Sequence, residues 1–121
     1  MNRTVASRRH AVGAHYGLMD WLIQRLSAVV MIVYTVFVLG IVLWIGGLDY
    51  DGFRGLFAFP GFRHASFLFM AALLYHAWIG VREILMDYVH PVGLRLALQA
   101  AFVALLVGYL GWTIQILWGQ P

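Results

Sequence analysis

The sequence predicts an all-α integral membrane protein with three transmembrane helices. Of its 121 residues, 63% are hydrophobic and only 11% are charged, and the mean hydropathy is +0.83. A soluble domain is normally about 45–50% apolar and about a quarter charged. A chain this short leaves much of its surface exposed, so it cannot hide that apolar excess from water. The composition therefore excludes a free-standing soluble enzyme and leaves room for about three spans of about 20 residues each.

The charged residues and the cysteine count exclude further classes of function. All eight basic residues are arginines and the net charge is +3. The charges are scattered rather than clustered, so no nucleic-acid partner is expected. The sequence contains no Cys, which excludes disulfides, thiolate catalysis and any iron–sulfur cluster held by this chain. Redox chemistry would therefore need other ligands or belong to a partner.

The first predicted element is a transmembrane helix at Leu22–Ile45, which follows a basic N-terminal segment at residues 1–19. The apolar run is too long for the core of a signal peptide, and no small-residue cleavage site follows it. Asp20 stands where an N-cap is expected, and Gly46 with Gly47 is typical of a helix end.

Residues 20–121 are predicted to form a three-helix membrane anchor domain. A Gly-rich loop at 46–63 precedes a second span at 64–89, and the third span follows at 92–118. Pro91 separates the last two spans, because it cannot continue the second helix but suits the first turn of the third. So short a connection predicts that these two helices form an antiparallel hairpin.

The arginines predict the orientation, because cytoplasmic loops are enriched in Arg and Lys. Most of them lie in the N-terminal segment, near the start of the first span or beside the hairpin turn, namely Arg3, Arg8, Arg9, Arg25, Arg82 and Arg95. This places the N-terminal segment in the cytoplasm and the C-terminus in the periplasm. We expect a multi-pass protein of the bacterial inner membrane, since the leader is short for a transit peptide.

Ionisable residues at membrane depth mark a candidate site on the second span. His76 lies near its middle, and Gly80, Glu83 and Asp87 follow on the same helix face at offsets of 4, 7 and 11. Such residues are costly in hydrocarbon and normally face a bundle interior, a partner or a cavity. His76 has three readings: an imidazole bonded to a neighbouring helix, an axial ligand of haem iron, or part of a proton relay with Glu83 and Asp87. The spacing alone leaves all three open.

Two observations predict a second membrane protein beside this one. A haem held by two histidines would need its second ligand from another chain, because only His76 lies at membrane depth. The other histidines lie at or beyond helix ends, namely His10, His15, His64 and His90. Three helices are also too few to enclose a haem. The third span carries a stripe of small residues that would let another helix approach, namely Ala97, Ala101, Ala104 and Gly108. We therefore expect this chain to be part of a heterodimeric helical bundle.

Two further positions have an ordinary and a functional reading. Tyr88, at the end of the second span, is most simply an interface anchor, although a phenol beside Asp87 can also hydrogen-bond a carbonyl group of a lipid-soluble ligand. The residues alone favour the anchor. Arg25, one turn into the first span, is explained by snorkelling to the interface, but an arginine at this depth can also pair with a haem propionate.

Four stretches carry a resemblance to a known family, namely GLMDW at 17–21, HAWIG at 76–80, DYVHP at 87–91 and LRL at 94–96. Together with the three-span layout and the ten residues between His76 and Asp87, they resemble the hydrophobic membrane anchor D subunit of succinate dehydrogenase. The resemblance covers nearly the whole chain and is densest over residues 76–99.

The resemblance implies a non-catalytic subunit of complex II. In that family the D subunit pairs with a C-type anchor subunit, which supplies the other haem ligand, and the two hold one haem b. The flavoprotein and iron–sulfur subunits dock on the cytoplasmic face, and electrons pass from succinate to ubiquinone. Carried over by motif, His76 is the haem axial ligand and Arg25 lies near a propionate. Tyr88 then donates a hydrogen bond to a quinone carbonyl, supported by Asp87.

Other functions stay open beside this one. A quinol:fumarate reductase has a related anchor, and a small proton channel or transporter would use His76, Glu83 and Asp87 as its relay. A cofactor-free assembly factor is the remaining class. The adjacent pair Arg82 and Glu83 departs from the family pattern, and adjacent helical residues do not face each other. We expect Glu83 to act on the haem, on a proton path or on an arginine of the partner.

Overall fold

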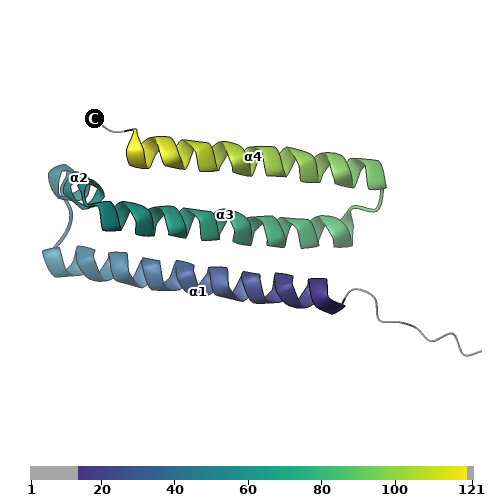
Figure 1. The fold of residues 1–121 in the computed structure, drawn as a ribbon, viewed down its shortest axis with the longest axis horizontal. Helices are drawn as coiled ribbons and strands as arrows, with labels where there is room; N and C mark the ends of the chain where they lie inside the picture. Colours follow the sequence, from purple (N-terminus) through teal and green to yellow (C-terminus); the bar gives the residue numbers. More distant parts are fainter. Residues whose placement is uncertain (1–13, 120–121) are drawn as a thin grey trace, which may run out of the picture.

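The computed structural model describes the backbone of residues 14–119 and the side chains of residues 17–119. The N-terminal arginines and His10 discussed above lie outside the described residues, as does the side chain of His15. The described residues form four helices in the order α1 (Ala14–Ile45), α2 (Tyr50–Ala58), α3 (Pro60–Tyr88) and α4 (Val92–Trp118) (Figure 1). The described residues contain no strand, so the all-α prediction is confirmed.

Three of these helices are long and apolar enough to cross a membrane, as predicted. The candidate spans are Gly17–Ile45 and Pro60–Tyr88, of 29 residues each, and Val92–Trp118, of 27 residues. About 20 residues suffice to cross the hydrocarbon core at 1.5 Å per residue. Helices longer than the hydrocarbon thickness are accommodated by tilting or by extending into the headgroup region.

Helix α1 ends where the sequence predicts but begins earlier than predicted. The helix begins at Ala14, so the prediction that Asp20 is its N-cap is wrong. Residues 14–19 contain no Pro, and their single glycine, Gly17, is tolerated within the helix, so α1 continues through Asp20. The C-terminus is as expected: Gly46 and Gly47 have φ of 78° and 115°. Their amides donate to the carbonyl oxygens of Leu43 and Val42, which is the Schellman arrangement.

The prediction of a loop over residues 46–63 is wrong, because this segment contains α2 and the first turn of α3. Asp49 is the N-cap of α2, and its carboxylate accepts a hydrogen bond of 2.8 Å from the amide of Gly52. Helix α3 begins at Pro60, earlier than the predicted residue 64, because Pro at the first helical position needs no backbone donor. Helix α4 has the predicted bounds, and Pro91 is its N-cap rather than its first residue.

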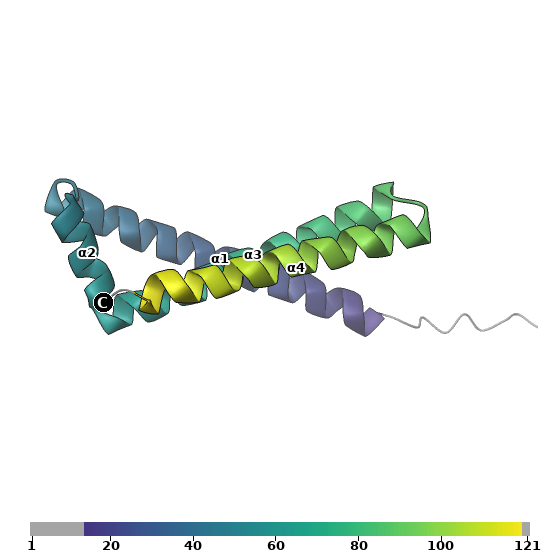
Figure 2. The same ribbon diagram turned by 90° about the horizontal axis from the view of Figure 1, so that it is seen from above.

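Helix α3 lies at the centre of the molecule and packs against the other three helices (Figure 1). Helices α3 and α4 form the predicted antiparallel hairpin, and α1 crosses that hairpin at an angle (Figure 2). The N-terminal end of α1 lies at the same end of the molecule as the connection between α3 and α4. The α2 helix and the C-terminal end of α4 lie at the opposite end (Figure 1).

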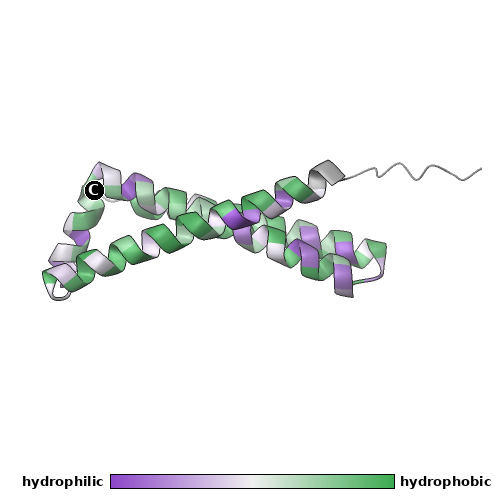
Figure 3. Cartoon of the chain, turned by 90° about the horizontal axis from the view of Figure 1, so that it is seen from below, coloured by the Kyte–Doolittle hydropathy of each residue, from purple (hydrophilic) through white to green (hydrophobic). Residues whose placement is uncertain are grey.

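Most apolar side chains face outward, as a membrane protein requires. Of the side chains at residues 17–119, only a few are buried, namely Phe62, Ile79, Leu117, Ser27, Ser66 and Thr113. Apolar residues cover the outer faces of all three long helices (Figure 3), and Trp44 is 92% exposed. The predicted small-residue stripe of α4 is also exposed, and a Cβ on Gly108 would meet no neighbouring atom within 4 Å. This stripe therefore does not mediate packing within the chain.

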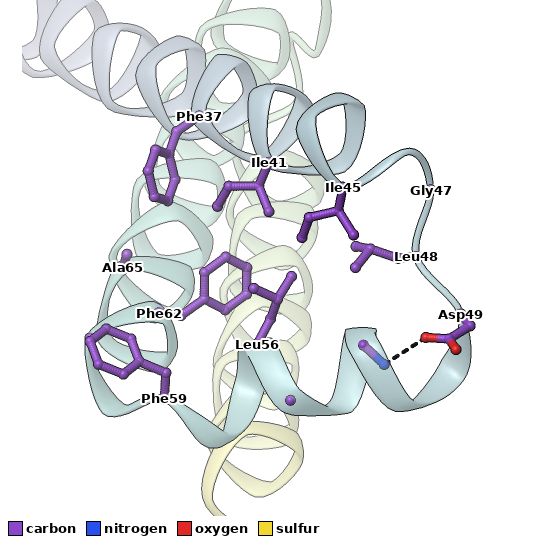
Figure 4. Close-up of a pocket in the computed structure, with 13 residues that line it drawn as sticks. Phe37, Ile41, Ile45, Gly47, Leu48, Asp49, Leu56, Phe59, Phe62 and Ala65 are labelled. Atoms are coloured by element: carbon purple, nitrogen blue, oxygen red, sulfur yellow. Dashed lines mark hydrogen bonds between the residues drawn. The ribbon is translucent and has the colours of Figure 1, made fainter.

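A cavity of about 460 Å³ lies between the C-terminal half of α1, α2 and the start of α3. Figure 4 shows apolar side chains around it, including Phe37, Ile41 and Phe62. The single carboxylate in its lining belongs to Asp49, which is already engaged in capping α2. The polar residues of interest are therefore found elsewhere, between α1 and α3.

Candidate functional site

A line of polar side chains joins α1 to α3 through the apolar interior. We call it the polar seam, and it consists of Asp20, Gln24, Ser27 and Tyr34 from α1 with Ser66, His76 and Arg82 from α3. Its α1 members are spaced four, three and seven residues apart, so they lie on one face of the helix. Because the helices are antiparallel, the first residue of the α1 series meets the last of the α3 series.

His76 lies at the centre of this seam and is held by α1. Its Nδ1 is 3.0 Å from the hydroxyl of Ser27 and 3.2 Å from the carbonyl oxygen of Gln24. Its Nε2 has only a longer contact, 3.4 Å, to the side-chain amide nitrogen of Gln24. His76 is half-buried, whereas Ser27 is only 6% exposed. The imidazole thus has one well-bonded nitrogen and one weakly engaged nitrogen.

The depth of His76 agrees with the sequence prediction. It lies near the middle of α3, 12 residues before Tyr88, which is about 18 Å along the helix axis at 1.5 Å per residue. In a span of 29 residues this places the imidazole within the hydrocarbon layer. A polar group at that depth needs partners, and Ser27 and Gln24 provide them.

Arg82 forms an ion pair with Asp20 of α1. The two residues are far apart in the sequence, and the pair joins the starting end of α1 to the last two turns of α3. This contact accounts for Asp20, which does not cap a helix, and gives Arg82 a structural partner within its own chain. Glu83, by contrast, is exposed. Adjacent residues on α3 therefore face different surroundings, as the helix geometry requires.

A double-mutant cycle tests the contribution of this ion pair. We expect Asp20→Ala and Arg82→Ala each to lower the free energy of unfolding. The double variant should lose little more stability than either single variant. The two side chains are 30% and 34% exposed, so the coupling should be modest, about 0.5–1 kcal/mol. Thermal unfolding in detergent measures it. As a control, the stability changes of Asp20→Ala and Arg95→Ala should add in the double variant. If those of Asp20→Ala and Arg82→Ala also added, the ion pair between Asp20 and Arg82 would be contradicted.

Arg25 lies on α1, next to Gln24, but on a different face of the helix. It is exposed, and its guanidinium carbon lies 4.4 Å from the centroid of the Trp21 ring. A cation over an aromatic face is favourable, so Trp21 holds Arg25 near the end of the molecule where α1 begins. The position suits both snorkelling and pairing with an anionic group of a partner or cofactor.

The predicted stripe on α3 divides into two parts. His76 and Gly80 are half-buried, whereas Glu83 and Asp87 are exposed. The ring nitrogens of His76 contact residues of α1, so the described contacts do not connect His76 with Glu83 or Asp87. Among the described residues, no hydrogen bond links these three side chains into a relay.

Asp87 and Tyr88 form the exposed end of α3. Tyr88 is the last residue of the helix and is 77% exposed, and Asp87 beside it is also exposed. They lie at the end of the molecule where α1 begins and where α3 connects to α4 (Figure 1). This is the end that the arginine distribution predicts to be cytoplasmic. A ligand or partner that approaches this end can reach the phenol.

The residues around His76 are compatible with a haem. The described residues contain no cluster of three or more His, Asp or Glu side chains that could hold a metal ion by themselves. A haem needs only one imidazole from this chain if a partner provides the other ligand. A Cβ added to Gly80, one turn from His76, would meet no neighbouring atom within 4 Å. Space beside the imidazole and a nitrogen without a strong partner both fit an axial ligand.

Sequence reasoning misses five residues of the polar seam. It assigns Asp20 to a helix cap and gives no role to Gln24, Ser27, Tyr34 and Ser66. The available signal is the regular spacing of the four α1 residues along an apolar span, because polar residues repeated at intervals of three and four line one helix face. That pattern predicts that α1 presents a polar face to a neighbouring helix.

Two comparisons with known proteins identify the family to which the chain belongs. Residues 1–110 match the family model described as "Succinate dehydrogenase/Fumarate reductase transmembrane subunit". The chain is also 36% identical over 102 residues to a protein of Coxiella burnetii named "Succinate dehydrogenase hydrophobic membrane anchor subunit", and the alignment covers 84% of this chain and 89% of that one. The chain therefore belongs to the family of transmembrane subunits of succinate dehydrogenases and fumarate reductases.

Proposed function

We propose that this chain is a membrane anchor subunit of succinate dehydrogenase that contributes a ligand to haem b and part of the ubiquinone site. It has no active site for succinate oxidation of its own and works with a C-type anchor, an iron–sulfur subunit and a flavoprotein subunit. The observation that carries the proposal is His76, held halfway along the central span by α1. The name of the Coxiella relative favours a succinate dehydrogenase over a fumarate reductase.

In this proposal His76 binds haem iron through Nε2, the nitrogen with only a long contact to Gln24. The haem, when bound, provides a one-electron redox centre between the two anchor subunits. The side chain of Gln24 would have to turn away from Nε2, and among the described contacts it would lose only this long one, since its carboxamide oxygen is buried without a hydrogen-bond partner. Arg25 lies on the exposed side of α1 and neutralises a propionate.

Tyr88 is proposed to donate a hydrogen bond from its hydroxyl to a carbonyl oxygen of ubiquinone. Its phenol is 77% exposed, so it is available to a ligand bound between this chain and the subunits on the same side. Asp87, the preceding residue and also exposed, supports Tyr88 by taking up a proton from water and passing it to the quinone as it is reduced. Both residues lie at the end expected to face the cytoplasm, where the iron–sulfur subunit would deliver electrons.

The composition of the purified complex tests this function. An affinity tag on this chain, expressed in its native membrane and solubilised gently, should recover a flavoprotein, an iron–sulfur protein and a second three-helix protein. The sample should give a b-type haem spectrum on reduction and should reduce ubiquinone with succinate. A colourless assembly that contains this chain alone would contradict the proposal and favour a channel or an assembly factor.

A further inference from the structure

The hydroxyl of Ser27 lies between His76 and the backbone of α1. It donates a hydrogen bond of 2.9 Å to the carbonyl oxygen of Gln24, one turn earlier in α1. The same oxygen lies 3.0 Å from Nδ1 of His76. A hydroxyl has one proton and two lone pairs. The carbonyl oxygen of Gln24 also lies 3.2 Å from Nδ1 and can only accept. The arrangement that satisfies all three groups therefore has Nδ1 as the donor and Ser27 as an acceptor from the ring.

This arrangement selects one form of the imidazole. The proton of a neutral His76 is placed on Nδ1, which leaves a lone pair on Nε2. The amide nitrogen of Gln24, 3.4 Å from Nε2, is a donor and agrees with this tautomer. The hydroxyl of Ser27 has little competition from solvent, because the residue is only 6% exposed and lies within the membrane span. The imidazole is therefore prepared to bind a metal through Nε2 before any metal arrives.

We propose that Ser27 is a positioning residue for the haem ligand, fixing both the tautomer and the ring orientation of His76. The inference rests on the proposed function, since it concerns the nitrogen that would bind iron. A hydrogen bond from the second ring nitrogen of a ligating histidine increases its basicity and restricts its rotation. Ser27 supplies this bond from a neighbouring helix, so the packing of α1 on α3 sets the orientation of the ligand.

The Ser27→Ala variant, studied in the complete complex, tests this inference. Without the hydroxyl, Nδ1 retains only the longer bond to the carbonyl oxygen of Gln24, at 3.2 Å, so the orientation of the ring is less restricted. Loss of such a partner typically weakens metal binding by about 10–100-fold. We expect haem transfer from the complex to excess apomyoglobin to accelerate within about that range. The electron paramagnetic resonance spectrum of the ferric haem, which depends on the orientation of the axial rings, should shift or broaden.

Ser66→Ala provides a matched control. Ser66 is 5% exposed, donates to a backbone carbonyl oxygen of its own helix and bonds Tyr34 rather than His76. The Ser66→Ala variant therefore reports the effect of removing a buried serine from the same helix interface. The haem of this variant complex should behave like that of the native complex. Ser27→Thr retains the hydroxyl and should restore the native spectrum. Ser27→Cys, similar in volume but a weak acceptor, replaces Ser27→Ala if the alanine variant does not assemble.

The outcomes separate this inference from the proposed function. A Ser27 variant that holds haem with native affinity and a native paramagnetic spectrum overturns the positioning role and leaves the function untouched. Loss of haem from Ser27→Ala but not from Ser27→Thr or Ser66→Ala supports it. A native complex that contains no b-type haem overturns the haem part of the proposed function and this inference with it.

Discussion

The His76→Ala variant should lose the b-type haem spectrum of the complex. Of the histidines whose side chains the structure describes, only His76 lies at mid-span. His64 is in the second turn of α3, and His90 lies in the connection after that helix. Alanine offers no lone pair to iron, and the other seam residues are poor substitutes, since a hydroxyl and a carboxamide are weaker ligands for haem iron than imidazole. Reduced-minus-oxidised spectra, normalised to the flavin content of the purified complex, measure the loss.

Two further variants make this result interpretable. His64→Ala removes an imidazole from the same helix, but one that bonds the carbonyl oxygen of Pro60 at the far end, and it should retain the full spectrum. His76→Gln keeps a polar side chain opposite Ser27, so it preserves packing between α1 and α3 better than alanine does. If His76→Ala and His76→Gln both assemble with native haem content, His76 is not the ligand and is simply an imidazole bonded between helices.

The parts of the fold that the sequence predicted well depend on local properties. Hydropathy located the three spans, because a membrane helix must be apolar over its whole length. Pro91 located the hairpin, since a proline after a helix leaves few other conformations. Helix α2 was missed because Gly52 and Gly55 lower its helix propensity. The N-cap Asp49 followed by Asp51 in the first turn was the signal that favoured a helix there.

The site was harder to predict because it depends on the register between two helices. Residue spacing placed His76 at mid-depth, but which residues of α1 lie opposite it is set by the packing of the whole interface. Likewise, nothing local indicates that Asp20 meets Arg82 rather than capping a helix. The polar residues of α1 follow a three–four spacing, but Ser66, His76 and Arg82 of α3 are ten and six residues apart. The pairs are therefore identified only by the packed register of the two helices.

The Tyr88→Phe variant should strongly reduce ubiquinone reduction while leaving succinate oxidation by an artificial dye intact. Phenylalanine retains the ring and its interfacial packing but removes the hydroxyl that would bind the quinone. Leaving a buried acceptor of the ligand without its hydrogen bond costs about 1–3 kcal/mol, which corresponds to a decrease of about 5- to 150-fold in kcat/KM for quinone. The dye reaction reports the flavoprotein and iron–sulfur subunits and should not change.

Tyr50→Phe is the matched control for this variant. Tyr50 is 76% exposed, almost the same as Tyr88 at 77%, but it begins α2 at the opposite end of the molecule (Figure 1). If both hydroxyls served only to anchor the chain in the interface, the two variants would behave alike and quinone reduction would be unchanged in both. A loss confined to Tyr88→Phe would place quinone chemistry at the end of α3, because the two substitutions differ in position and not in kind.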